Sequence, residues 1–253
     1  MAITVDARLR PAVQARYFHV LMAACCVAIA FLGFAPTYWL PLAAGTLKAN
    51  PVVHIHGLVF FSWTLFFLFQ AWLVASGRTA RHRSIGLIGI SLATMMTMLG
   101  IITAINQTKG AIAIGQAEAG KAFAIVPLAG IAFFAVAVAV AIAEVRRPEI
   151  HRRLMLLASI SILDAPIARW FLTFLAPPGP PGPPPVAADI GPAAVTWLLL
   201  GAAIVHDWRR TGRPHPIYLI GGAALVAVKL VQIPLSTTAV WHSLAEWLVG
   251  LAS

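Results

Sequence analysis

Residues 50–76 read NPVVHIHGLVFFSWTLFFLFQAWLVAS, a stretch that contains no Asp, Glu, Lys or Arg. About 20 predominantly apolar residues suffice for a helix to cross a bilayer. The stretch therefore predicts a transmembrane helix over about residues 54–76. Its two histidines, His54 and His56, stand at the start of that helix, where an imidazole is costly unless something binds it.

Similar apolar runs occupy most of the chain on both sides of this stretch. Of its 253 residues, 60% are apolar and 10% are charged, whereas an ordinary globular domain has about a quarter charged residues. We predict an all-α fold: one integral membrane domain over residues 1–253, a bundle of seven spanning helices with a short C-terminal helix on the outer face. The expected spans are about 19–40, 54–76, 85–106, 121–144, 154–176, 191–207 and 216–235, and the outer helix is 239–252.

The basic residues divide unevenly between the two sets of joints that connect these runs. Cytoplasmic loops of membrane proteins concentrate Lys and Arg, so the N-terminus is expected in the cytoplasm of a bacterial cell, with the chain in the inner membrane. The excess positive charge then faces anionic lipid headgroups, and nucleic acid is not an expected partner. Thirteen arginines lie in one set, at 8, 10, 16, 78, 81, 83, 146, 147, 152, 153, 209, 210 and 213, against three lysines in the other, at 48, 109 and 121.

Three histidines are predicted at the outer face: His54, His56 and His242. Residues two apart on a helix point about 200° apart, so either His54 lies on the entering loop or only one of the pair is a ligand. Glu246 follows His242 by one helical turn, a spacing at which a carboxylate can orient an imidazole. The three histidines are candidate metal or haem ligands with Glu246 behind them. The alternative is that they are interfacial histidines bonded to loop carbonyls.

At the inner face, His82 and His151 each open a predicted helix beside arginines. Both lie at one level on the third and fifth spans, so a haem held between two axial histidines is one interpretation. The other is that both rings contact water and lipid phosphate.

Two opposite charges are predicted inside the bilayer. Asp164 lies roughly 15 Å along the fifth span and Lys229 roughly 20 Å along the seventh, at a rise of 1.5 Å per residue. Because both spans run outward, the two side chains come to nearly one depth, where charges tend to pair and to mark function. The pair is either a structural ion pair or a proton or substrate site.

The segment from His54 to about Trp170 resembles a family of bacterial multi-helix membrane proteins known only as a domain of unknown function. The matching features are HIHG at 54–57, Gln70, RHRSIG at 81–86 and EIHRRLM at 149–155. The resemblance covers about half of the chain and implies a helical bundle similar to the transmembrane cytochromes b, which carry haem between histidines of neighbouring helices.

The leading interpretation is therefore a membrane redox protein that passes electrons through b-type haem or another metal, with a quinone or another redox carrier as its partner. A proton-coupled small-solute transporter that uses Asp164 and Lys229 is the main alternative, and an assembly factor without chemistry is the third. Whether the chain is an enzyme stays open, since it has neither an HExxH metalloprotease motif nor a CxxCH motif for covalent haem.

Overall fold

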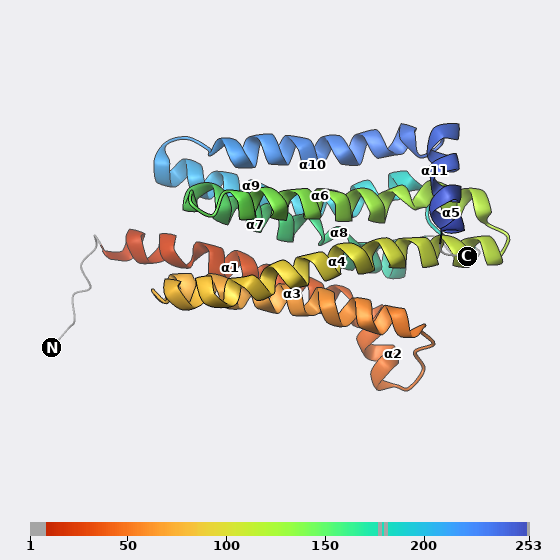
Figure 1. Ribbon diagram of the computed structural model, residues 1–253, viewed down its shortest axis with the longest axis horizontal. Helices are drawn as coiled ribbons and strands as arrows, with labels where there is room; N and C mark the ends of the chain where they lie inside the picture. Colours follow the sequence, from red (N-terminus) through yellow and green to blue (C-terminus); the bar gives the residue numbers. More distant parts are fainter. Residues whose placement is uncertain (1–8, 177–178, 180–181, 252–253) are drawn as a thin grey trace.

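In a computed structural model, the protein consists of long helices that run side by side (Figure 1). The structure describes residues 9–176, 179 and 182–251. The described residues form no β-strand, so the predicted all-α class is confirmed. Arg8 of the N-terminal basic group and Ala252 at the end of the predicted outer helix lie outside the described residues.

The helices follow one another in a simple up-and-down order. The first half of the chain forms α1 (Leu9–Gly33), a π-helix (Ala35–Trp39), α2 (Leu40–Ala43), α3 (Pro51–Ala75), α4 (Thr79–Ala113) and α5 (Ala117–Phe123). The second half forms α6 (Ile125–Ala143), α7 (Pro148–Ser161), α8 (Asp164–Trp170), a second π-helix (Phe171–Leu175), a 3₁₀ helix (Val186–Asp189), α9 (Ile190–Thr211), α10 (Pro216–Leu235) and α11 (Ala239–Gly250).

Six helical stretches of the described chain are long and apolar enough to cross a membrane, and a seventh is added if α1 and the bent segment after it form one span. That bend, of 40°, separates Tyr17–Gly33 from Ala35–Ala43. Six or seven such helices agree in part with the predicted bundle of seven spanning helices, and several apolar helices of this length indicate a multi-pass membrane protein.

Several helices, among them α1, α3, α4 and α7, begin earlier than the apolar runs indicate. In α3, Pro51 occupies the first turn, where its missing N–H costs nothing, and the side chain of Asn50 caps the helix by accepting a bond from the Val52 N–H at 3.0 Å. His54 therefore lies on the helix itself and not on an entering loop. The helix α4 extends the predicted span 85–106 by several residues at both ends, because its charged flanks remain helical beyond the apolar run.

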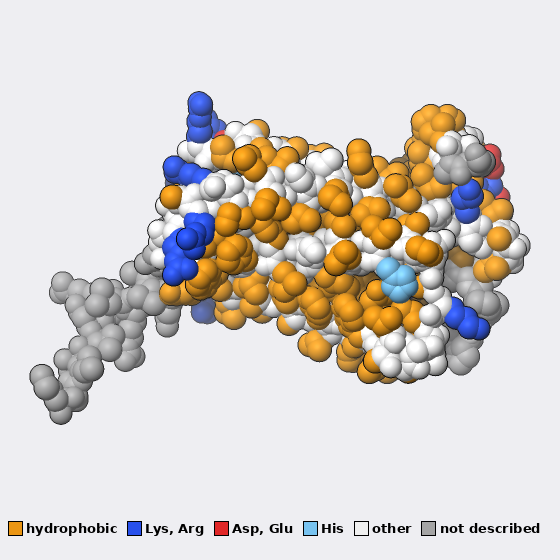
Figure 2. Space-filling model, turned by 60° about the horizontal axis from the view of Figure 1, so that its bottom comes forward, with side chains coloured by type: hydrophobic (Ala, Val, Ile, Leu, Met, Phe, Trp, Pro, Cys, Tyr) orange, Lys and Arg blue, Asp and Glu red, His pale blue; other side chains and the backbone are white. Residues whose placement is uncertain are grey.

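The basic joints lie at one end of the bundle, and hydrophobic side chains lie along its side. The start of α1 and the α3–α4, α6–α7 and α9–α10 joints lie at one end, on the left of Figure 1, and α2, α5 and α11 lie at the other. Figure 2 shows most of the visible Lys and Arg side chains at that left end and hydrophobic side chains along the side between the ends. Large hydrophobic side chains such as Leu58, Leu87 and Leu198 are exposed, which suits contact with lipid.

The helix that carries Asp164 is interrupted at its middle. α7 ends at Ser161 and α8 begins at Asp164, because Pro166 has no N–H to donate to the preceding turn and its ring clashes there. The end of α1 packs directly against this break: a Cβ on Gly33 would overlap the backbone of Pro166. A glycine at the end of α1 thus allows the close approach that holds the broken helix in place.

Candidate functional site

Two carboxylates and one lysine meet in the interior of the bundle. Lys229 Nζ lies 2.7 Å from Asp164 Oδ2 and 2.5 Å from Asp189 Oδ2. All three residues are buried, with exposed fractions of 2% for Lys229, 6% for Asp164 and 8% for Asp189. We call these three residues the ion cluster. It joins α8, the 3₁₀ helix before α9, and α10.

Two neutral side chains complete the hydrogen bonding of the ion cluster. The Thr196 hydroxyl donates to Asp164 Oδ1 at 2.7 Å. The Gln232 amide nitrogen donates to Asp189 Oδ2 at 2.8 Å. Lys229 and Gln232 are three residues apart on α10 and therefore share one face of that helix.

The charges of the ion cluster do not balance. Among the described residues, Lys229 is the one basic side chain within ion-pair distance of either carboxylate. Two ionised aspartates and one ammonium group sum to one negative charge. An uncompensated charge in such an interior is costly, and one further positive charge, such as a proton on either carboxylate, would neutralise the cluster.

The predicted contact between Asp164 and Lys229 is confirmed, but the sequence argument missed Asp189. Asp189 lies just before the expected sixth span, at the end of the loop. It was not predicted as a site residue because Asp164 and Lys229 already formed a neutral pair. A signal was present: Asp189 directly precedes Ile190-Gly-Pro, where an acidic residue at a helix start is common. The pattern gives no direction for its side chain, which turns inward to Lys229.

The outer histidines do not converge. The Tyr38 hydroxyl bonds His54 Nδ1 at 2.8 Å, and the Thr103 hydroxyl bonds His56 Nδ1 at 3.2 Å. His242 lies on α11, which packs against α5 and α4, and not against the start of the second span as its predicted role requires. In the part of the chain that the structure describes, no group of three or more His, Cys, Asp or Glu is arranged to hold a metal.

Glu246 does not orient His242. Its carboxylate instead accepts a bond from Lys121 Nζ at 2.7 Å, and His242 Nδ1 bonds Glu118 at 3.0 Å while Nε2 bonds the Ser236 carbonyl at 2.9 Å. The pairing within one helix fails because α11 turns both side chains toward α5, where Glu118 and Lys121 are closer partners. The bond to Ser236 is the kind that the interfacial interpretation predicted.

The inner histidines, by contrast, are neighbours. The ring centroids of His82 and His151 lie 6.3 Å apart, with their planes at 75°. His151 Nδ1 donates to the Ala141 carbonyl at 2.8 Å. His82 Nδ1 and both amide atoms of Gln70 are buried without a hydrogen-bond partner.

A second buried ion pair lies near these histidines at the arginine-rich end. Arg153 donates from Nε to Asp207 Oδ2 at 2.7 Å and from Nη2 to Asp207 Oδ1 at 3.0 Å. Glu149 also accepts from Arg153, at 2.6 Å. This bidentate pair joins α7 to α9. Because Glu149 also pairs with Arg152, two arginines face two carboxylates here and the charges balance, unlike those of the ion cluster. We therefore assign it a structural role.

Comparison with protein-family models, with curated proteins and with solved structures finds no match to the chain. The resemblance to a cytochrome-b-like family accordingly stays a prediction, and the chemistry of the site rests on its own geometry.

Proposed function

We propose that this protein is a proton-linked carrier of a small solute, with Asp164, Asp189 and Lys229 as its proton-binding site. The observation that supports this best is the charge of the ion cluster: two buried carboxylates share one lysine. Buried ionisable residues in membrane helices are characteristic of proton relays and substrate pathways. We orient the chain with its arginine-rich end in the cytoplasm of a bacterial cell, following the distribution of basic residues between the two ends.

The broken helix α7–α8 supports a role in transport. In many carriers, interrupted helices place polar groups at a binding site inside the membrane. Here the interruption at residues 162–163 brings Asp164 to Lys229, and α10 supplies both the lysine and Gln232. Proton binding at Asp164 or Asp189 would remove the excess negative charge and release one bond of Lys229, which gives a physical link between protonation and packing.

Charge movement after a pH jump tests this function without knowledge of the solute. Liposomes that contain the protein are adsorbed on a solid-supported membrane, and the external pH is lowered in one step. We expect a transient current, because protons enter the membrane field to reach the ion cluster. Asp164→Asn and Asp189→Asn should abolish the current, whereas Glu144→Gln should retain it, since Glu144 pairs with Arg147 at the end of the bundle. A wild-type current no larger than that of protein-free liposomes overturns the proposal.

A redox function is the second candidate, and the pair His82 and His151 is what favours it. The two rings are adjacent, and the unpartnered atoms of His82 and Gln70 fit a group bound between α3, α4 and α7. His82 and His151 would hold a haem or another metal at this position. Such a group, when bound, would carry the electrons. The test is the visible spectrum of the protein purified from haem-replete cells, before and after reduction. A Soret band that His151→Ala removes supports this function, and a colourless preparation contradicts it.

A further inference from the structure

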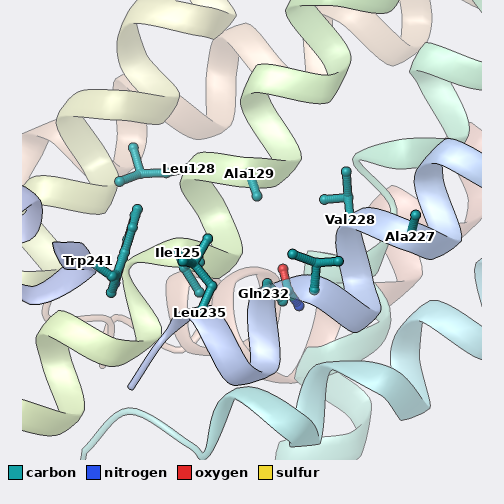
Figure 3. Close-up of a pocket in the computed structure, with 9 residues that line it drawn as sticks. Ile125, Leu128, Ala129, Ala227, Val228, Gln232, Leu235 and Trp241 are labelled. Carbon is teal, nitrogen blue, oxygen red and sulfur yellow. The ribbon is translucent and has the colours of Figure 1, made fainter. Parts of the chain in front are cut away.

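An apolar cavity of about 490 Å³ opens beside the ion cluster, on the side of the bundle where α6, α10 and α11 meet (Figure 3). We call it the α6–α10 groove. Its walls include Leu128 and Ala129 of α6, Val228 and Val231 of α10, and the ring of Trp241. Among the described residues no charged side chain lines it, so these walls offer no counter-ion to a charged headgroup.

One polar side chain stands in this apolar wall. Gln232 lines the groove and is only 2% exposed, and its Oε1 is buried without a hydrogen-bond partner. Figure 3 shows the oxygen of Gln232 directed into the space near Ala129 and Val228, with the nitrogen on the opposite side. The indole N–H of Trp241 is already used, since it donates to the Lys121 carbonyl at 2.8 Å.

The orientation of the Gln232 amide follows from its other contact. A carboxylate only accepts hydrogen bonds, so the NH₂ end must face Asp189 and the carbonyl end must face the groove. A buried carbonyl oxygen without a donor is costly. The lining of the groove therefore suits a mainly apolar ligand that carries one hydrogen-bond donor.

A second cavity of about 390 Å³ lies beyond Leu128 and Trp241, which line both spaces. Its other walls come from α4, α6 and the end of α11 and include Thr97, whose hydroxyl already donates to the Ala93 carbonyl at 2.9 Å. The unpartnered hydrogen-bond acceptor thus lies on the Gln232 side. The neighbouring cavity has room for the apolar tail of a ligand bound there.

We propose that the α6–α10 groove binds an uncharged lipophilic molecule with a hydroxyl group, which enters from the bilayer and donates a hydrogen bond to Gln232 Oε1. The inference rests on the proposed carrier function and names the class of its solute. The bond joins the solute to Asp189 through a single amide, so that solute and proton sites share Gln232.

Photolabelling tests this inference with two matched probes. The protein in liposomes is irradiated with an eight-carbon alcohol that carries a diazirine, and in parallel with the diazirine alkane of equal length. Mass spectrometry then quantifies labelling of the groove residues. We expect the alcohol to label them about three- to tenfold more than the alkane, the factor that one neutral hydrogen bond contributes.

Two variants distinguish the effect of the hydrogen bond to Gln232 from the effect of the cavity volume. Gln232→Leu should reduce alcohol labelling to the level of the alkane. Ala129→Phe, which keeps Gln232 and fills the groove, should reduce labelling by both probes. Leu198→Phe is the matched control, since Leu198 is an exposed side chain of α9 outside the groove, and should change neither.

Equal labelling by alcohol and alkane in the wild-type protein overturns the inference, because the groove would then be only a slot for lipid chains. This result would leave the pH-jump current intact. Conversely, loss of that current with retained alcohol preference would contradict the carrier function and keep the groove as a binding site.

Discussion

Removal of the lysine from the ion cluster is the perturbation with the largest expected effect. Lys229→Met keeps the length of the side chain but leaves Asp164 and Asp189 without their shared partner. Two unit charges about 4 Å apart interact by about 4 kcal/mol at an effective dielectric constant of 20, and stranding a buried charge costs about 3–5 kcal/mol. Since 1 kcal/mol corresponds to about 2–4 °C in a chain of this size, we expect the melting temperature to fall by about 6–20 °C.

The third member of the cluster determines how the loss is rescued. Adding Asp164→Asn to Lys229→Met should recover only part of the stability, because Asp189 remains charged. Adding Asp189→Asn as well should recover most of it, since neutral replacement of a whole buried ion group is often nearly neutral in free energy. Thermal unfolding in detergent, followed by circular dichroism at one heating rate, measures the series, with the exposed Lys48→Met as control. If the single effects simply add within about 0.5 kcal/mol, the three residues are not coupled and the reasoning fails.

Three further outcomes are expected. Gly33→Ala should destabilise the protein by about 1–3 kcal/mol, because the added Cβ would overlap the backbone at Pro166. The control Gly130→Ala, whose Cβ would meet nothing within 4 Å, should be neutral or stabilising. Equal melting temperatures for the two variants would contradict close packing of Gly33 against Pro166. Burial lowers the pKa of His215 from its ordinary 6.5, and its neutral Nδ1 caps α10 by accepting from the Ile217 N–H, so this contribution to stability is present above pH 6.5 and is lost as the pH falls. His215→Asn should retain the cap and weaken that pH dependence, measured as melting temperature against pH. Reporter fusions at Gly179 should be active only outside the cytoplasm, and the opposite result would reverse the assigned orientation.

Helix positions and depths were predictable because they depend on local composition. The apolar run at 216–235 coincides with α10, and a fixed rise of 1.5 Å per residue was enough to bring Asp164 and Lys229 to one level before any packing was known. Boundaries were less predictable, since a charged flank such as residues 79–84 continues a helix as readily as it ends one. Pro166 is visible in the sequence, but the proline alone does not predict that the helix is interrupted at residues 162–163.

The partners of polar side chains at the outer end could not be predicted from spacing alone. Glu246 and His242 have the correct separation for a bond within one helix, yet each finds its partner on α5. That choice depends on how α11 packs, which no local pattern encodes. For the same reason Asp189 was missed, because it is distant in sequence from Lys229 and meets it only through the tertiary fold.

Gln232 connects the two proposals, and this gives a last test. Its amide is held by Asp189, so the acceptor end faces the groove only while a carboxylate stands behind it. In Asp189→Leu this constraint is gone, and Asp164 and Lys229 remain as a balanced pair that should keep the fold. The amide can then turn its NH₂ group toward the groove, which favours a ligand that accepts a hydrogen bond. We therefore expect Asp189→Leu to lose the preference for the alcohol probe and to gain labelling by the matched diazirine ether, which has no donor. Unchanged preference for the alcohol in this variant would show that Asp189 does not set the chemistry of the groove, and that the ion cluster and the groove act independently.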